Sequence, residues 1–151
     1  MTRLPAAVLL LIAGTAVADD AAAKKMLKDL EGSYTPAVMT SAGNAIDEAL
    51  LKDTSFTIKG DTFTFRYKMK NKTEEKQAVI VLDPSQKPAA IDLTPKDGPD
   101  ASRPMLGIVK IEKDAVTLCW SDRRDKPERP KDFSSTKENG YFLIVMKKAR
   151  D

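Results

Sequence analysis

The sequence predicts a mainly β protein: a small antiparallel barrel of about eight up-and-down strands, preceded by a short N-terminal helix. The clearest observation is an alternation with period two, in which the apolar residues Phe63, Phe65 and Tyr67 are separated by polar ones. A Gly60-Asp61 pair just before this segment is typical of a tight hairpin turn. Segments of this kind recur at hairpin-like spacing along the chain, as expected for a meander of strands.

Two helices accompany the expected strands. In the first, residues 19–30, acidic residues come first and lysines follow, which suits the helix dipole, and Gly32 ends it. The second is expected over residues 46–52, between the first two strands. The expected strands cover residues 33–39, 55–59, 62–69, 77–82, 89–94, 105–111, 116–120 and 141–146.

These strands can be arranged in two ways. A closed barrel of this size has an interior that holds its own side chains or one small ligand. A two-sheet sandwich is the alternative. Strands after residue 77, such as 77–82, are apolar on both faces, so something should cover the outside of one barrel wall. The N-terminal helix is the candidate that the sequence offers.

Residues 83–100, DPSQKPAAIDLTPKDGPD, combine prolines, acids and a short apolar core. Proline and glycine at both ends predict a turn, a short strand over 89–94 and a second turn, rather than a linker. Asp92 points opposite to Ile91 and Leu93 in such a strand. Periodicity favours a solvated, outward Asp92, and a polar group inside the barrel is the alternative.

Residues 1–18 have the features of a secretory signal peptide. Arg3 precedes the apolar run 6–13, and Ala16-Val17-Ala18 fits the small-x-small cleavage pattern. The run is shorter than the about 20 apolar residues of a stable membrane span, although an uncleaved anchor or a buried helix is the alternative. We therefore expect export to the periplasm or the medium, with residues 19–151 as a single domain that has no membrane span after cleavage.

The composition excludes several kinds of site. The chain has no histidine and one cysteine, Cys119, which rules out Cys/His zinc sites, Ser-His-Asp triads and an internal disulfide. Nucleotide-binding loops and calcium-loop spacing are absent, so we expect no cofactor and no metal. A net charge of +3 with interspersed signs argues against a nucleic-acid partner. Cys119 lies in an apolar segment, which favours a buried side chain over a reactive thiol.

Residues 30–135 contain an ordered series of short motifs: LEGSY at 30–34, FTIKGDTF at 56–63, DPS at 83–85 with Pro88, IDLT at 91–94, LGI at 106–108, LC at 118–119, RP at 129–130 and FSS at 133–135. In this order the motifs resemble an uncharacterised lipocalin-like domain family abundant in planctomycete bacteria. The resemblance covers nearly all of residues 19–151 and implies a lipocalin-like barrel and export, but no substrate. Residues 66–72 depart from the family's short Gly-rich turn, so this hairpin is expected to be longer.

The resemblance also draws attention to Asp92 and Arg129, which both fall in its motifs. Arg129 lies in the charged connection 122–132 between the last two strands, which reads most simply as a solvated loop. Arg129 precedes Pro130, which favours an extended backbone and a side chain aimed back at the barrel. We therefore predict that Arg129 pairs with Asp92 at one end of the barrel.

Three functions are compatible with these features. The first is a barrel that holds a small apolar or amphipathic molecule, and the second is an exported interaction or inhibitor module with a packed interior. An enzyme is third, because histidine and catalytic motifs are missing. An open interior above about 300 Å³ would favour the first over the second. The candidate ligand-binding residues are Tyr34, Phe63, Phe65, Tyr67, Asp92, Trp120 and Arg129.

Overall fold

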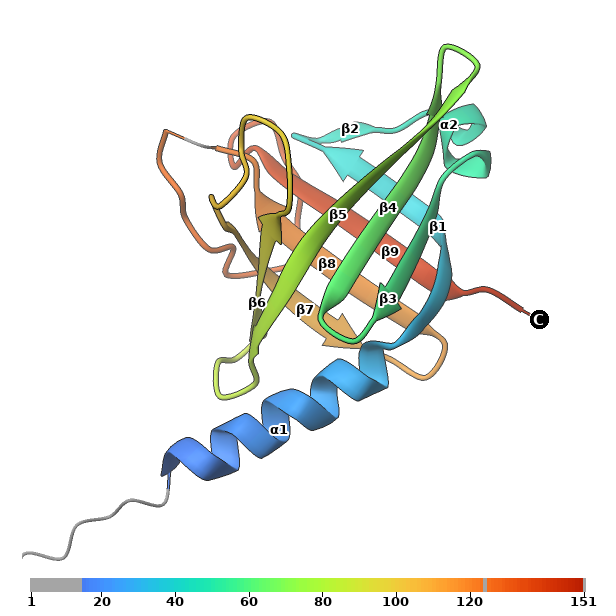
Figure 1. Cartoon of the computed structure of the whole chain (residues 1–151). Coiled ribbons are helices and arrows are strands. Elements are labelled where there is room, and N and C mark those ends of the chain that lie inside the picture. The colour runs from blue at the N-terminus through green and yellow to red at the C-terminus, as the bar shows by residue number, and fades with distance from the viewer. Residues whose placement is uncertain (1–14, 124, 151) are drawn as a thin grey trace, which may run out of the picture.

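The computed structural model describes residues 15–123 and 125–150, and it is a closed antiparallel barrel of eight strands with a helix at one end (Figure 1). The barrel closes because β1 pairs with both β3 and β9. A further two-residue strand, β2, pairs only with the end of β1. The strands are β1 (Gly32–Ser41), β2 (Asn44–Ala45), β3 (Ser55–Lys59), β4 (Thr62–Met69), β5 (Lys72–Asp83), β6 (Ala89–Pro95), β7 (Met105–Ile111), β8 (Ala115–Ser121) and β9 (Tyr141–Lys148).

Every barrel strand pairs with its neighbour in the chain, so the topology is the predicted meander and not a sandwich. The predicted hairpin over residues 55–69 is confirmed, since β3 and β4 pair in register from Ser55↔Arg66 to Lys59↔Thr62. β4 and β5 continue this regularity to Met69↔Lys72, which makes a long hairpin that projects beyond the barrel (Figure 1). Its turn is formed by Lys70 and Asn71, both with positive φ, as a twisted two-residue hairpin turn requires.

The two helices lie outside the barrel. Helix α1 (Thr15–Leu30) crosses beneath the barrel end at which β1 begins (Figure 1). Its last residue, Leu30, is fully buried, and the Tyr34 hydroxyl donates a 2.6 Å hydrogen bond to the Leu30 carbonyl. Helix α2 (Glu48–Lys52) begins after Asp47, whose side chain accepts a hydrogen bond from the Ala49 amide as an N-cap. Most of the expected leader, residues 1–14, lies outside the described residues.

The predicted inner and outer faces of β4 are confirmed. Phe63 is buried and Phe65 is half-buried against the core, whereas Arg66 and Lys68 are exposed. On β6, Ile91 and Leu93 point inward and are 2% and 1% exposed. The core therefore lies inside the barrel, as alternation with period two requires for a sheet that is wet on its outside.

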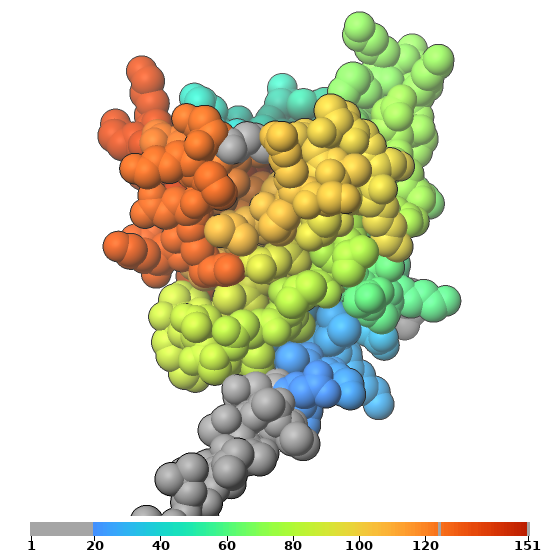
Figure 2. Space-filling view, turned by 60° about the vertical axis from the view of Figure 1, so that its left-hand side comes forward, coloured from blue at the N-terminus to red at the C-terminus, as the bar shows by residue number. Residues whose placement is uncertain are grey.

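The prediction that the N-terminal helix covers an outer wall is wrong, because the β8–β9 connection does so. Within this connection the Ser134 carbonyl accepts a 3.4 Å hydrogen bond from the Cys119 thiol, and the centroid of the Phe133 ring lies 5.3 Å from Lys110 Nζ. The outward side chains of Ile108 and Cys119 are thereby buried to 1% and 0% exposure. Figure 2 shows this connection beside the β6–β7 loop. We call residues 122–140, apart from the undescribed residue 124, the outer strap.

Cys119 is buried, as the sequence predicts, but on the outer side of the barrel wall. Burial raises the pKa of its thiol to about 11, and Asp132 of the outer strap adds to this increase. A thiol in this state is protonated at neutral pH and is a poor nucleophile. Its position accounts for why β8 is buried on both faces: one face lines the barrel interior and the other lies under the outer strap.

Candidate functional site

The candidate site is a cavity of about 510 Å³ in the half of the barrel that lies farther from α1. Its walls come from all eight barrel strands, and its mouth is bordered by the β6–β7 loop. Most of the lining is apolar. Representative lining side chains are Met39, Phe56, Phe65, Leu93, Trp120 and Phe142.

One wall of the cavity is a column of stacked aromatic rings on β3 and β4. Phe56 stacks on Phe63 and on Phe65, with ring centroids 5.6 Å and 5.2 Å apart. The Phe65 ring in turn stacks on Tyr67 at 4.7 Å. The column arises because Phe56 and Phe65 are direct cross-strand partners, and inward side chains recur every second residue. It runs from the buried core toward the projecting β4–β5 hairpin.

A second aromatic stack lies on β8 and β9. Trp120 and Phe142 are cross-strand partners, and their rings stack with centroids 4.8 Å apart and planes inclined by 16°. In the closed barrel, β8 is separated from β4 by three strands in either direction. The two stacks therefore lie on opposite walls of the same cavity.

The barrel half nearer to α1 is filled and forms the floor of the cavity. Tyr34, Ile91, Leu118 and Met146 are each at most 2% exposed there, with Leu30 of α1 beside them. Burial raises the pKa of the Tyr34 phenol, whose hydroxyl is already used by the Leu30 carbonyl. The interior is thus packed at one end and open at the other.

Polar and charged groups lie around the mouth of the cavity. Lys76, which is exposed and lies directly opposite Phe65 in the β4–β5 register, is on one side of the mouth. Asp97 and Asp100 of the β6–β7 loop and Asp122 after β8 stand on the others. An apolar cavity with a polar mouth can take up an apolar body and leave a polar end in water.

The structure distributes the sequence-predicted site residues over four places. The cavity wall contains Phe63, Phe65 and Trp120. Tyr67 stacks on Phe65 above the cavity but is not part of its lining. Tyr34 belongs to the packed floor near α1, where its hydroxyl is bound to the Leu30 carbonyl. Asp92 and Arg129 are on the outside of the barrel.

The predicted ion pair between Asp92 and Arg129 is present. Arg129 Nη1 donates to Asp92 Oδ1 at 2.8 Å and to the Gly107 carbonyl at 2.7 Å. The predicted place at a barrel end is wrong: Ile91 and Leu93 point inward, so Asp92 must point outward. The pair fastens the outer strap to β6 and β7, and its location argues against a role in contacting a molecule in the cavity.

Sequence reasoning missed several cavity residues. Phe142 lies on β9, where residues 141–146 are apolar throughout, so no alternation reveals which side chains point inward. Met39 and Met105 were missed for a related reason, since each lies near a strand end with weak alternation. Phe56 could have been found, because it alternates with polar neighbours and faces Phe65 across the predicted hairpin.

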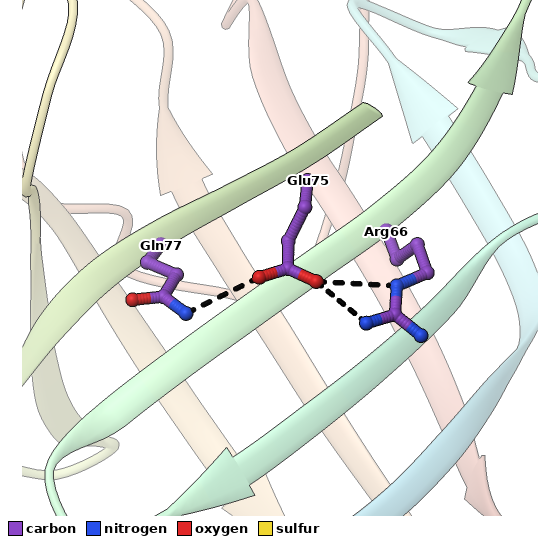
Figure 3. A network of polar contacts seen from close by, with 3 residues as sticks. All are labelled: Arg66, Glu75 and Gln77. Atoms are coloured by element: carbon purple, nitrogen blue, oxygen red, sulfur yellow. Dashed lines mark hydrogen bonds and ion pairs between the residues drawn. The ribbon is translucent and has the colours of Figure 1, made fainter. Parts of the chain in front are cut away.

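A charged network on the outside of the β4–β5 hairpin is not part of the site. Glu75 Oε2 accepts hydrogen bonds from Nε and Nη2 of Arg66 at 3.2 and 2.6 Å, and Gln77 donates to the other Glu75 oxygen at 3.3 Å (Figure 3). The Arg66 hydrogen bonds lower the pKa of the exposed Glu75 carboxyl. Because Arg66 and Glu75 are cross-strand partners, the network supports the register of the hairpin.

Neither a metal nor a membrane span is indicated by the part of the chain that the structure describes. Residues 15–123 and 125–150 contain no group of three or more histidine, cysteine or acidic side chains placed to hold a metal ion. None of the helices described is long and apolar enough to cross a bilayer.

Comparison of the chain with protein-family models, with curated proteins and with solved structures finds no match in any of the three.

Proposed function

We propose that this protein is an exported small barrel that binds a small apolar or amphipathic molecule in the cavity between the two aromatic stacks. The observation that carries the proposal is the open half of the barrel, about 510 Å³, beside a half that is fully packed. Ligand cavities of proteins are about 300–1,000 Å³ and are lined mainly by apolar and aromatic side chains with a few polar groups. This cavity fits that description in size and lining.

Burial of apolar surface supplies the free energy of binding. A molecule that enters the cavity exchanges water for contact with rings and aliphatic side chains, at about 25 cal/mol for each Å² of apolar surface removed from water. The cavity wall is held by continuous strand pairing, so little ordering is required of the protein when it binds. Lys76 at the mouth can contact a polar end of the bound molecule.

An exported interaction module with a packed interior is the second candidate. Its barrel would be expected to fill both halves with side chains, as the half near α1 does around Leu30 and Tyr34. The open half favours the binding protein over this module. A non-enzymatic role is part of the proposal, because the chain has no histidine and the Cys119 thiol is buried outside the cavity.

Export is proposed from the leader-like residues 1–18 and from the resemblance to the lipocalin-like family. Of helix α1, cleavage after Ala18 would remove only residues 15–18 and would leave residues 19–30 attached to the barrel. The later part of that helix carries the contacts that matter to the barrel, with Leu30 buried and Met26 and Leu27 packed against the core. Ion pairs Asp20–Lys24 and Lys25–Asp29 also lie after this point.

Titration with N-phenyl-1-naphthylamine, a neutral dye that fluoresces in apolar surroundings, tests the binding. We expect saturable fluorescence and quenching of Trp120, which is the chain's one tryptophan and lies in the cavity wall. Ala78→Leu should fill part of the cavity and weaken binding, because Ala78 lines it. Val81→Leu is the matched control, since Val81 lies on the outward face of the same strand and is 59% exposed.

Circular dichroism must show that each variant is folded. If Ala78→Leu does not fold, Met105→Trp is a second variant that should fill part of the cavity. Unchanged dye binding by a folded cavity-filling variant would contradict the proposal, as would an absence of saturable binding to the wild-type protein. Native mass spectrometry of the protein purified from its own host would identify a retained molecule.

A further inference from the structure

The cavity gathers most of the aromatic side chains of the chain. Four of its five phenylalanines and its one tryptophan line the cavity, and the fifth phenylalanine, Phe133, lies on the outer strap. The lining members are Phe56, Phe63, Phe65, Trp120 and Phe142. An interior designed only to be apolar needs no such concentration, since aliphatic side chains fill barrel interiors equally well, as around Ile91 and Leu118 in the floor.

We infer that the cavity selects planar aromatic molecules, which insert between the stack of Phe56 and Phe65 on one wall and the stack of Trp120 and Phe142 on the other. This inference rests on the proposed binding function and specifies the class of ligand. The shared feature of the class is a rigid, flat π-system with one polar substituent, which remains at the mouth near Lys76.

The first physical reason is the interaction between aromatic rings. Rings attract one another in offset-stacked and edge-to-face arrangements beyond the effect of area, by an amount that corresponds to roughly two- to twelvefold in affinity for each contact. The two stacks provide such partners on both sides of an entering ring, because β4 and β8 face each other across the barrel. A saturated molecule of similar size gains the burial of apolar surface but not these ring contacts.

The second reason is rigidity. Each stacked ring is held by a neighbour, with interplanar angles of 11° for Phe56–Phe65 and 16° for Trp120–Phe142, so the walls have a defined shape. A flexible acyl chain loses rotational freedom when it enters a cavity with fixed walls, whereas a planar molecule has little to lose. Met39 and Met105, which also line the cavity, add polarisable sulfur atoms that contact aromatic rings favourably.

Three alcohols with the same number of carbon atoms separate these effects: 2-naphthalenemethanol, decahydro-2-naphthalenemethanol and 1-undecanol. Their dissociation constants are measured by isothermal titration calorimetry, and each association constant is divided by the probe's partition coefficient from water into octanol to remove the difference in hydrophobicity. After this correction we expect the naphthalene compound to bind roughly fivefold or more tightly than its decahydro analogue. The flexible undecanol should bind more weakly than both.

Variants of the protein then test which side chains cause the preference for the aromatic alcohol. Phe65→Leu and Phe142→Leu keep an apolar side chain in the cavity wall and remove one ring each, so each should reduce the naphthalene-to-decahydro affinity ratio by roughly two- to twelvefold. Phe133→Leu removes a ring from the outer strap, away from the cavity, and should leave the ratio unchanged. Only variants whose circular dichroism spectrum matches that of the wild type are compared. If no variant folds, the naphthalene-to-decahydro affinity ratio of the wild-type protein alone tests the selectivity.

The outcomes distinguish this inference from the proposed function. Equal corrected affinities for the naphthalene and decahydro compounds would overturn the aromatic selectivity and leave a general apolar site standing. The same reduction of the ratio in Phe133→Leu as in Phe142→Leu would overturn it too, because the effect would not arise in the cavity. Failure of all three alcohols and of the naphthylamine dye to bind would overturn both the inference and the function.

Discussion

Arg129 and Asp92, which lie 37 positions apart in the sequence, form an ion pair on the outer wall of the barrel with Nη1 and Oδ1 2.8 Å apart. The same Arg129 nitrogen donates to the Gly107 carbonyl at 2.7 Å, so one guanidinium joins the outer strap to β6 and β7. The two side chains are 32% and 31% exposed. Partial burial strengthens such a pair relative to one at an open surface, without the full desolvation cost of a pair in the core.

A double-mutant cycle tests the pair. Asp92→Asn and Arg129→Gln should each lower the free energy of unfolding by about 1–2 kcal/mol, because a hydrogen bond to a charged group is lost at a partly exposed site. The double variant should cost less than the sum of the two, by about 1 kcal/mol. Urea denaturation provides the measurement, and strictly additive effects would show that the two charges are not coupled.

The register of β4 predicts a contrast between adjacent residues. Phe65→Ala should lower the free energy of unfolding by about 3 kcal/mol, since its ring stacks on Phe56 and Tyr67. Arg66→Ala should cost no more than about 1 kcal/mol, because its partner Glu75 is 40% exposed and its own side chain is 58% exposed. Urea denaturation of both variants under identical conditions checks the contrast, and similar costs would mean that the register is different.

Cys119 should make stability depend on alkaline pH. Its folded pKa is raised from 9.0 to about 11, so between these values the unfolded chain releases a proton that the folded protein retains. The stabilising contribution is therefore complete below pH 9 and is lost as the pH rises toward 11, by about 2–3 kcal/mol in total.

The difference between wild type and Cys119→Ala isolates this effect, since the tyrosines, including Tyr34 and Tyr141 with raised pKa values, titrate in both proteins. Thermal unfolding at pH 8 to 11 is the measurement. A constant difference between the two proteins across this range would mean that the thiol is not protected from ionisation by the outer strap.

Gly107 should not tolerate a side chain. A Cβ at this position would lie 2.8 Å from the Cys119 carbonyl oxygen and 3.2 Å from the Ile91 carbonyl oxygen, both backbone atoms of the neighbouring strands. Gly107→Ala should therefore lower the free energy of unfolding by about 1–3 kcal/mol through overpacking. Urea denaturation measures the loss, and a neutral result would mean that β7 can shift away from its neighbours without cost.

Residues 1–18 predict where the proposed exported form of the protein begins. N-terminal sequencing of protein recovered from the host envelope or medium should begin at Asp19, because Ala16-Val17-Ala18 fits the cleavage pattern. Replacing Ala18 by Arg is the matched variant, since a large charged residue at this position should block cleavage. Recovery of wild-type protein that still begins at Met1 would contradict cleavage.

The sequence by itself determined those features that depend on near neighbours in the chain. The inward face of β4, the turn at Gly60-Asp61 and the inward direction of Ile91 follow from alternation and turn chemistry, which each short segment carries in its own residues. The eight-strand count follows from the spacing of those segments.

Only the tertiary structure decided which segment covers the outer wall, where the Asp92–Arg129 pair lies and that half of the interior is open. A residue such as Phe142, in a strand that is apolar on both faces, has no local signal for its direction; that direction depends on Trp120 beside it and on the outer strap behind it. The volume of the cavity likewise depends on side chains from all eight barrel strands. Such properties are set by contacts between distant parts of the chain, and local periodicity carries no information about them.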